Sequence, residues 1–557
     1  IDTAFSSGFA NRYNSAGGVD PPNPNATNWV RTTKSLTVTG FTVPPTGDNW
    51  LHLRWNVYHA SGCTTTQQAD EVAIDNVVVR ANDQTLLNEN FNTYARTGLG
   101  NVEYPVKYHG VGGAVANDFG GTLLFFDSTV RGNTAVLQGG GVHNHCNNNN
   151  DENATVILNN TTFRDNAAPG AWLKFYTDQN PKVTGQGGGI YNEGKTELYT
   201  SSMFNNSTAT DGGGFYNNGR LVLANSLVDS NAALYTQPDG SALGNGGGIA
   251  NYFIGVLTIN DSMIINNEAN NRGGGIDTLS GNPVVINNST IANNTAYLGD
   301  GGGIYNTART RVGGGNNSRC CDWASRLTLN NVTVSGNLAG NRGGGIYQDV
   351  EVDINVWIRI TNGTIVDNFA QWNGGGLHFD FSSTNDNRRS WMRNTIVANN
   401  QVGTAGGGAQ CAGSQQIGSG SLTATTSKGF NIISDTSCTN ASAAKDDLIG
   451  VNVTYNALAN NLGPKVGAST YERTLLTHKL TGGESNPAIN RIPTASSSNG
   501  CPATDARGFP RPRTTADQCD VGAYEVAPPQ AVDDFVSTPI ATPITFSVTA
   551  NDIAPDG

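Results

Sequence analysis

Nine of the Gly-Gly-Gly triplets in the chain follow one another at intervals of 25 to 48 residues, and this repeat restricts the possible folds more than any other feature of the chain. The residue after a triplet is usually apolar, as at Ile249, Ile276 and Ile304, and Asn often follows two positions later. Self-similarity at such a period is typical of solenoids, in which each repeat forms one coil. The triplets begin at Gly139, Gly187, Gly212, Gly246, Gly273, Gly301, Gly343, Gly374 and Gly406.

Short alternating segments precede most triplets, and a period of two residues indicates β-strands. Leu257-Thr258-Ile259-Asn260 is one such segment, and a turn and a second short strand such as Thr290-Ile291-Ala292 follow in the pattern. We predict three strands per repeat and a parallel β-solenoid with Ile, Val and Leu inside and Gly at tight turns. Corner Asn amides are expected to bond to the next coil. These Asn stand six residues before a triplet at Asn133, Asn206, Asn267, Asn337, Asn368 and Asn400, with Asn294 one residue out of register.

Composition excludes several other classes of protein. The chain has 557 residues with a net charge of −12, and it contains no run of Lys or Arg, so we expect no nucleic-acid partner. No stretch reaches the roughly 20 apolar residues of a membrane span. The chain begins at Ile1 without a signal-like segment, so a mature or trimmed product is expected.

Residues 110–435 resemble the right-handed parallel β-helix proteins of bacterial surfaces, including the polymorphic outer-membrane proteins. Their repeats join a Gly-Gly-x-Ile phrase to an F-x-x-N phrase, and Phe163-Arg164-Asp165-Asn166 matches the second phrase directly. The resemblance implies an all-β fold. It does not imply one activity, because β-helices carry lyases, hydrolases, adhesins and inert stalks.

Residues 436–526 look like the choice-of-anchor type Q module, which closes the β-helices of secreted bacterial proteins. Ala506 and Asn490 replace the Gln and Asp that are usual in that module. The resemblance implies a cap over the open last coil, whose backbone groups would otherwise lack partners. The match begins at Gly429-Phe430-Asn431-Ile432-Ile433 and includes Leu462-Gly463-Pro464, Asn486-Pro487-Ala488-Ile489, Asp505-Ala506-Arg507-Gly508 and Cys519-Asp520-Val521-Gly522-Ala523-Tyr524-Glu525.

Each end of the chain resembles part of another β domain. Residues 1–100 are similar to a jelly-roll-like β-sandwich through the Ile74-Asp75-Asn76-Val77 phrase, and its first strands are missing. Residues 527–557 are similar to the start of a cadherin-like, Ig-like repeat. We therefore predict that the tail donates a strand, through Ile544, Phe546 and Val548, to the sandwich of the next copy, giving a head-to-tail filament. Artificial trimming of a longer surface protein is the alternative.

The eight cysteines suggest an oxidising compartment. Cys411 and Cys438, and likewise Cys501 and Cys519, are separated by loop-like sequence, as disulfide partners often are. The partners of the other four, Cys63, Cys146, Cys320 and Cys321, stay open. We expect an extracellular protein, secreted or attached to a bacterial cell surface.

No catalytic set stands out in the sequence. Polysaccharide hydrolases and lyases on β-helices need paired carboxylates or a strong base on one face. Asp165, Asp229 and Asp367 recur, but they stand one or two residues before corner Asn positions and are interpreted as turn-formers. The leading hypothesis is a non-enzymatic structural or adhesive protein, for example an adhesin or a biofilm-matrix filament, with its own copies or surface glycans as partners. A polysaccharide-active enzyme is the alternative.

Other candidate sites are scattered. Calcium, the one cofactor considered, would be bound by Asp75, Asp533, Asp534 and Asp552, which supply hard oxygen ligands at domain junctions. His143, His145 and Cys146 could form a metal-binding loop or an incidental insertion. The glycosylation candidates, each heading an N-x-S/T triplet that also suits a turn, are Asn153, Asn206, Asn316 and Asn440. The candidate sugar or partner contacts, which could equally cover a neighbouring coil, are Trp172, Phe175, Tyr176, Tyr235 and Trp372.

Overall fold

The computed structural model describes a stack of parallel strands that continues through the repeat region. The described residues are 72–74, 77–81, 84–89, 93–95, 111–117, 121–145, 154–173, 182–236, 243–308, 326–350, 357–381, 390–404, 406–413, 427–438, 446–494, 501–511, 518–526, 535–539 and 543–547. Two compact units divide the chain, Ile1–Ile74 with Tyr94–Tyr104, and Asp75–Thr93 with Pro105–Gly557. Before residue 111, β1 (Val72–Ile74) pairs with β4 (Thr93–Ala95), and β2 (Val77–Ala81) pairs antiparallel with β3 (Gln84–Glu89). The rest of the predicted jelly-roll sandwich lies outside the described residues.

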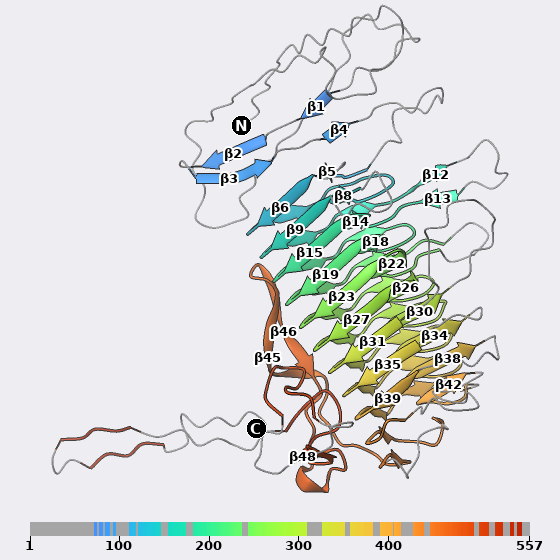
Figure 1. Ribbon diagram of the computed structural model, residues 1–557, viewed down its shortest axis with the longest axis vertical. Helices are drawn as coiled ribbons and strands as arrows, with labels where there is room; N and C mark the ends of the chain where they lie inside the picture. The colour runs from blue at the N-terminus through green and yellow to red at the C-terminus, as the bar shows by residue number, and fades with distance from the viewer. Residues whose placement is uncertain are drawn as a thin grey trace, which may run out of the picture. The chain divides into compact units, whose positions relative to one another are not determined.

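The central coils of the solenoid each contribute one strand to each of four parallel sheets, so the fold is an all-β parallel β-helix (Figure 1). The ten-stranded sheet follows the glycine triplets. It contains β5 (Val115–Asn117), β8 (Val142–Asn144), β14 (Ile190–Asn192), β18 (Phe215–Asn217), β22 (Ile249–Phe253), β26 (Ile276–Ser280), β30 (Ile304–Ala308), β34 (Ile346–Val350), β38 (Leu377–Phe381) and β42 (Cys411–Gly413).

The nine-stranded sheet comes next along each coil. It contains β6 (Thr122–Phe126), β9 (Thr155–Asn159), β15 (Lys195–Tyr199), β19 (Arg220–Ala224), β23 (Val256–Asn260), β27 (Pro283–Asn287), β31 (Arg326–Asn330), β35 (Trp357–Thr361) and β39 (Trp391–Arg393). The eleven-stranded sheet follows. It contains β7 (Thr129–Arg131), β10 (Thr162–Arg164), β16 (Ser202–Phe204), β20 (Leu227–Asp229), β24 (Met263–Ile265), β28 (Thr290–Ala292), β32 (Thr333–Ser335), β36 (Thr364–Val366), β40 (Ile396–Ala398), β43 (Ile432–Ile433) and β44 (Leu448–Ile449).

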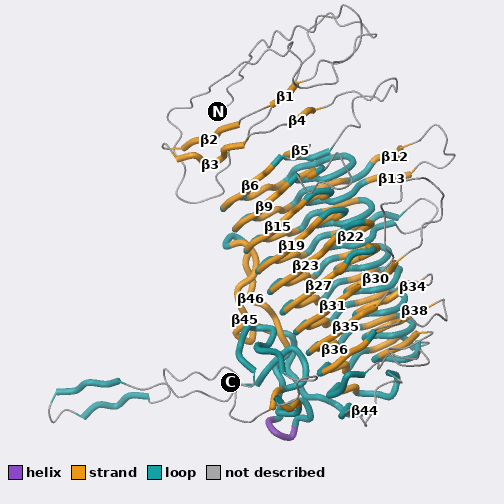
Figure 2. The backbone as a smooth tube through the Cα atoms, in the orientation of Figure 1, coloured by secondary structure: helices purple, strands orange, loops and turns teal. Residues whose placement is uncertain are grey.

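A fourth strand in each coil was not predicted from the sequence. These strands have two residues each, too few to produce an alternating pattern, and they form the eight-stranded sheet. The three strands expected per repeat are therefore four in the structure, with short corners between them (Figure 2). The strands are β11 (Ala167–Ala168), β17 (Ser207–Thr208), β21 (Ala232–Ala233), β25 (Glu268–Ala269), β29 (Thr295–Ala296), β33 (Leu338–Ala339), β37 (Phe369–Ala370) and β41 (Gln401–Val402).

Two features of the glycine triplet explain why it recurs. Gly273 opens its triplet with φ of 63°, a left-handed conformation that favours glycine. Gly274 lies so close to the next coil that an added Cβ would be 2.5 Å from the carbonyl oxygen of Gly302. The prediction that the triplets mark tight turns and close contact between coils is confirmed.

Polar ladders run through the interior beside the aliphatic core. Asn267 donates from Nδ2 to Asn294 Oδ1 at 3.0 Å, and Asn294 donates in the same way to Asn337 at 2.9 Å. Asn294 is therefore in register, because the extra residue that displaced it in the sequence falls between it and its triplet. The predicted ladder of corner Asn is confirmed. It extends through Asn133, Asn166, Asn206, Asn231, Asn267, Asn294, Asn337, Asn368 and Asn400.

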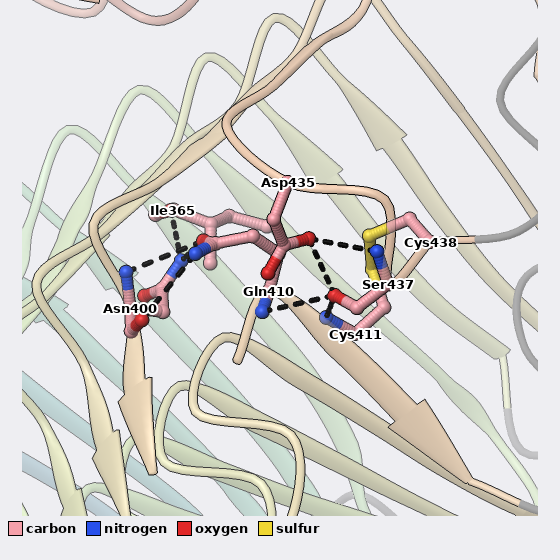
Figure 3. The surroundings of a disulfide bond; sticks show 7 residues. All are labelled: Ile365, Asn400, Gln410, Cys411, Asp435, Ser437 and Cys438. Carbon is pink, nitrogen blue, oxygen red and sulfur yellow. Dashed lines mark hydrogen bonds between the residues drawn. A yellow bond between two sulfur atoms is a disulfide. The ribbon is translucent and has the colours of Figure 1, made fainter. Parts of the chain in front are cut away.

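Asp435, Ser437 and Cys438 lie against the coil that contains Gln410 and Cys411 (Figure 3). Gln410 ends the Asn ladder by accepting a hydrogen bond from Asn400 Nδ2 at 2.7 Å. Ser437 Oγ accepts from the backbone N–H of Cys411 at 3.0 Å, and a disulfide joins Cys411 to Cys438. The parallel ladder itself continues beyond the predicted boundary at residue 435, since β43 pairs with β44.

The C-terminal module lies along the solenoid and not only over its end. Its hairpin, β45 (Ala459–Ala468) and β46 (Tyr471–Thr477), covers the outer face of the eleven-stranded sheet (Figure 1). Leu227, Met263 and Ile265 point outward there and pack with Val466 and Leu475 in a second apolar layer. Hydrogen bonds join Thr162 Oγ1 with Thr470 Oγ1 at 2.8 Å, Ser202 Oγ to Tyr471 O at 2.7 Å and Thr290 Oγ1 to Leu476 O at 2.6 Å.

The remaining elements belong to insertions and to the same module. β12 (Ala171–Leu173) pairs with β13 (Lys182–Thr184), and β47 (Ile492–Pro493) pairs with β48 (Gln518–Cys519). A 3-10 turn, η3, spans Gly483–Ser485.

One of the three recurring aspartates does not have its predicted role. Asp165 and Asp367 are confirmed as turn residues, each with φ of 57°. Asp229 instead ends β20 and is fully buried, and Ser230 makes the turn with φ of 56°. The Asp229 carboxylate accepts hydrogen bonds from Tyr471 Oη at 2.9 Å and Arg473 Nε at 3.0 Å, so it anchors the hairpin.

Candidate functional site

The outer face of the ten-stranded sheet concentrates aromatic and ionisable side chains. Aromatic rings stack from coil to coil, with centroids 5.0 Å apart for Tyr191 and Tyr216 and 5.1 Å apart for Tyr305 and Tyr347. Charged residues that directly precede the glycine triplets line one border of these stacks. The repeat therefore builds a polar, aromatic face from residues that are distant in the sequence, although these four rings are themselves only 2 to 6% exposed.

Asp211, Tyr252, Arg272 and Asp277 form the first charged cluster on this face. Tyr252 Oη donates to Asp277 Oδ2 at 2.6 Å, and Arg272 Nε donates to the same oxygen at 3.0 Å. Tyr252 Oη also lies 3.3 Å from Asp211 Oδ1. Burial raises the pKa of Asp211 to about 6. Because Tyr252 is only 6% exposed and Asp277 is fully buried, this cluster mainly joins adjacent coils.

Asp300, Arg342, Tyr347, His378 and Asp380 form the second cluster, which is more open. Arg342 donates to Asp300 Oδ1 from Nε at 3.1 Å, to Asp300 Oδ2 from Nη2 at 3.2 Å and to Asp380 Oδ2 from Nη1 at 2.7 Å. Its guanidinium carbon lies 4.9 Å from the centre of the Tyr347 ring, in a cation–π contact. The Asp380 side chain keeps 37% of its surface exposed.

Burial changes the protonation of two members of this second cluster. It raises the pKa of Asp300, although the Arg342 guanidinium opposes the shift. It lowers the pKa of His378 to about 4, and the nearby Arg342 charge acts in the same direction. His378 is therefore a neutral imidazole at pH 7, stacked on Tyr347 with a centroid separation of 5.1 Å.

A polar hollow of about 410 Å³ opens beside the second cluster. Arg342, Asn373, His378 and Asp380 line it. Residues 407–408 and the strand β42 itself complete the lining. Chemically, such a hollow offers hydrogen-bond donors and acceptors. Asp380 lines it, and Asp300, whose pKa is raised, bonds to Arg342 beside it. Pairs of this kind can bind hydroxyl groups or transfer protons.

The sequence reasoning missed this set of residues because its members come from different coils. Asp300 and Arg342 are 42 positions apart, and no short motif contains both. A signal was present nonetheless, since the residue before eight of the nine triplets is polar, as at Asp211, Arg272, Asp300 and Arg342. No catalytic set was recognised in the sequence, and the structure brings Asp300, Arg342, His378 and Asp380 together on one face.

The predicted calcium ligands fall in parts of the chain that the structure does not describe. Asp75, Asp533, Asp534 and Asp552, the calcium candidates, lie outside the described residues. Over the ranges that the structure describes, no group of three or more His, Cys, Asp or Glu side chains is placed to hold a metal ion.

The predicted metal-binding loop at His143, His145 and Cys146 contributes a ring to the aromatic stacks. His143 stacks on Tyr191 at 5.0 Å between ring centres, His145 pairs with Glu193, and Cys146 is outside the described residues.

Both predicted cysteine pairs are disulfides in the structure, Cys411–Cys438 and Cys501–Cys519. Of the glycosylation candidates, Asn153, Asn316 and Asn440 lie outside the described residues.

The prediction is wrong for Asn206, which is fully buried. Its amide donates to Asn231 Oδ1 and to the carbonyl oxygen of Phe163, both at 3.0 Å. The Asn ladder therefore uses the nitrogen that a glycan would require.

Two residues of the predicted donor strand are described, and both are exposed, Ile544 by 48% and Phe546 by 45%. Val548 lies outside the described residues, as do Phe175 and Tyr176 and the side chain of Trp172. Trp372 is 50% exposed, and Tyr235 is partly exposed.

Over the described ranges the chain forms no helix with the length and hydropathy that a membrane crossing requires. No protein-family model, curated protein or solved structure matches this chain.

Proposed function

We propose that this chain is a subunit of an extracellular bacterial fibre and that its C-terminal segment adds a strand to the next copy. The observation that carries the proposal is the exposure of large apolar residues in the extended segments 535–539 and 543–547. Phe535 is 93% exposed, and Ile544 and Phe546 are about half exposed at 48% and 45%. Exposed apolar side chains that alternate with polar ones suit β-strand addition, in which main-chain bonds hold the strand and alternate side chains fill pockets.

Two further features support a mechanical role outside the cell. Disulfides persist in oxidising compartments, and the structure contains two of them. The polar ladders hold consecutive coils together by side-chain hydrogen bonds that water does not reach, which suits a rigid rod. Adhesion to a surface or matrix would use the long side faces of the solenoid.

Negative-stain electron microscopy of the full chain over a range of concentrations tests the proposal. The wild type is expected to form head-to-tail fibres whose length increases with concentration. Ile544→Asp combined with Phe546→Asp should abolish them, because charges would enter apolar pockets. Thr545→Asp combined with Ser547→Asp is the matched control and should leave assembly intact, since these residues point to the other side of the strand.

Particles that stay monodisperse at every concentration would overturn the fibre proposal. Fibres that survive Ile544→Asp with Phe546→Asp would overturn strand addition as their cause. Calcium at Asp533, Asp534 or Asp552 belongs to the same proposal, and fibres that require calcium and dissolve in a chelator are the expected outcome for it.

A polysaccharide-active enzyme is the second candidate, and the Asp300–Arg342–Asp380 cluster favours it. Asp300 has a raised pKa and Asp380 is partly exposed, which is a possible general acid and base arrangement. Incubation with neutral and acidic polysaccharides tests this candidate. Release of reducing ends by the wild type but not by Asp380→Asn is the expected result for an enzyme, and no release from any substrate rejects it.

A further inference from the structure

We propose that the polar hollow beside β42 binds one sugar unit of an uncharged polysaccharide. The proposal goes beyond fibre formation and does not depend on it, because the hollow lies on the solenoid and the exposed apolar segments lie after residue 534. It names a binding site and a ligand class for this surface, whether or not the bound sugar is cleaved.

The lining of the hollow has the mixed donors and acceptors that sugar hydroxyl groups need. A guanidinium has five N–H donors, and three hydrogen bonds from Arg342 go to Asp300 and Asp380, so donors remain. The Asn373 amide and the neutral His378 ring can each donate and accept. Adjacent hydroxyls of a sugar ring donate and accept in the same way, so they match this set.

His378 provides an independent sign that the hollow is built for a polar ligand. The residue is only 4% exposed, and its Nδ1 has no hydrogen-bond partner among the described residues. Leaving a buried polar atom without a partner is costly, and functional sites are where such atoms persist. The ring is held flat against Tyr347, so its position is fixed before any ligand arrives.

Charge indicates that the ligand is neutral. One guanidinium, Arg342, faces the two carboxylates of Asp300 and Asp380, and the whole chain carries a net charge of −12. An anionic sugar such as a uronate would meet repulsion from the carboxylates and would compete with them for Arg342. A volume of about 410 Å³ is in the range of small-ligand pockets, and its polar lining does not suit an apolar molecule.

Trp372 extends the site along the surface. It directly precedes Asn373, and its carbonyl oxygen accepts a hydrogen bond at 3.0 Å from the N–H of Gly407, another residue that lines the hollow. Its side chain is 50% exposed. The apolar C–H face of a neighbouring sugar unit can pack on such an indole ring. Trp suits this contact because its ring is apolar while its N–H can stay in water.

Isothermal titration calorimetry on the full chain tests the proposal. The probes are cellohexaose, mannohexaose and maltohexaose, with hexagalacturonate as the anionic comparison. At least one neutral hexaose is expected to bind, and hexagalacturonate is expected not to bind. Asn373→Ala should weaken the neutral hexaose about fivefold and Asp380→Asn about tenfold, since each removes hydrogen bonds to the ligand.

Asn245→Ala is the matched control, because Asn245 also precedes a glycine triplet but bonds to Asp211 away from the hollow. It should leave affinity unchanged. Trp372→Ala removes an exposed side chain and should also weaken binding, so the test does not depend on the cluster variants folding. No binding of any neutral hexaose, binding of hexagalacturonate alone, or equal affinity in wild type, Asn373→Ala and Trp372→Ala would each overturn the proposal.

Discussion

The Asn ladder allows a sharp prediction at Asn267, whose side chain is fully buried. Its Nδ2 donates to Val228 O and to Asn294 Oδ1, both at 3.0 Å. Its Oδ1 accepts from the backbone N–H of Asn231 at 2.9 Å and from Asn231 Nδ2 at 3.0 Å. Asn267→Ala therefore removes the acceptor of two buried donors. The Asn231 N–H is left unpaired, whereas Asn231 Nδ2 keeps Met203 O at 2.9 Å and Asp229 O at 3.1 Å. At about 2 kcal/mol for the unpaired donor and less for the weakened one, the free energy of unfolding should fall by about 3 kcal/mol.

A second variant and a control distinguish the effect of the buried Asn ladder from the effect of losing any polar side chain. Asn267→Asp keeps an acceptor but replaces the donating NH₂ by an oxygen that faces Val228 O and Asn294 Oδ1, so it should destabilise at least as much. Asn287→Ala is the control, because Asn287 is half-buried and bonds to Asn260 Oδ1 at 2.8 Å where water can substitute. Its cost should stay below about 1 kcal/mol.

Urea unfolding followed by circular dichroism measures these changes, and hydrogen exchange locates them. Amides of β20, β24 and β28 should lose protection in Asn267→Ala and keep it in Asn287→Ala. Equal destabilisation by the two alanine variants would refute the reasoning, because it would mean that the buried ladder contributes no more than a hydrated one.

Three further predictions concern the Cys411–Cys438 disulfide, the hairpin and the histidine of the hollow. Replacing Cys411 and Cys438 by Ala should lower the free energy of unfolding by up to about 3.5 kcal/mol from chain entropy for a separation of 27 residues, and thermal unfolding checks this. Leu475→Ala, at a fully buried position, should cost about 3 kcal/mol and expose the hairpin to limited proteolysis before the solenoid. Because the pKa of His378 is lowered to about 4, the unfolded state binds more protons below pH 6.5, so stability from this residue is lost as pH falls from 6.5 to 4. His378→Gln should remove that part of the pH dependence of Tm.

Sequence reasoning predicted the coil well because the evidence for it is local. Alternation such as Leu257-Thr258-Ile259-Asn260 lies within one strand, and each triplet marks one corner. The Asn ladder followed from the repeat, since equivalent residues of stacked coils must be neighbours. The two-residue strands could not be predicted in this way, because two residues carry no period.

The hairpin and the charged surface could not be read from local pattern. β45 contains Gly463 and Pro464 and lacks apolar alternation, so it does not look like a covering strand. The surface that the hairpin covers did leave a signal in the sequence. Met263 and Ile265 are apolar on the outer side of β24, where a sheet facing water would carry polar residues. Asp229 was misinterpreted for the same reason, since its partners Tyr471 and Arg473 come more than 240 positions later.

The hairpin also changes how the solenoid would respond to tension. Hydrogen bonds between coils point along the stacking direction, so a pull in that direction opens them one coil at a time. The hairpin runs in that direction. It is bonded to Thr162 of β10 through Thr470 at its turn and to Thr290 of β28 through Leu476 of β46. These coils can separate only if the hairpin slides along them and breaks several contacts at once, including the buried Asp229 anchor. The coils under the hairpin therefore form a reinforced segment, as the proposed fibre subunit would require.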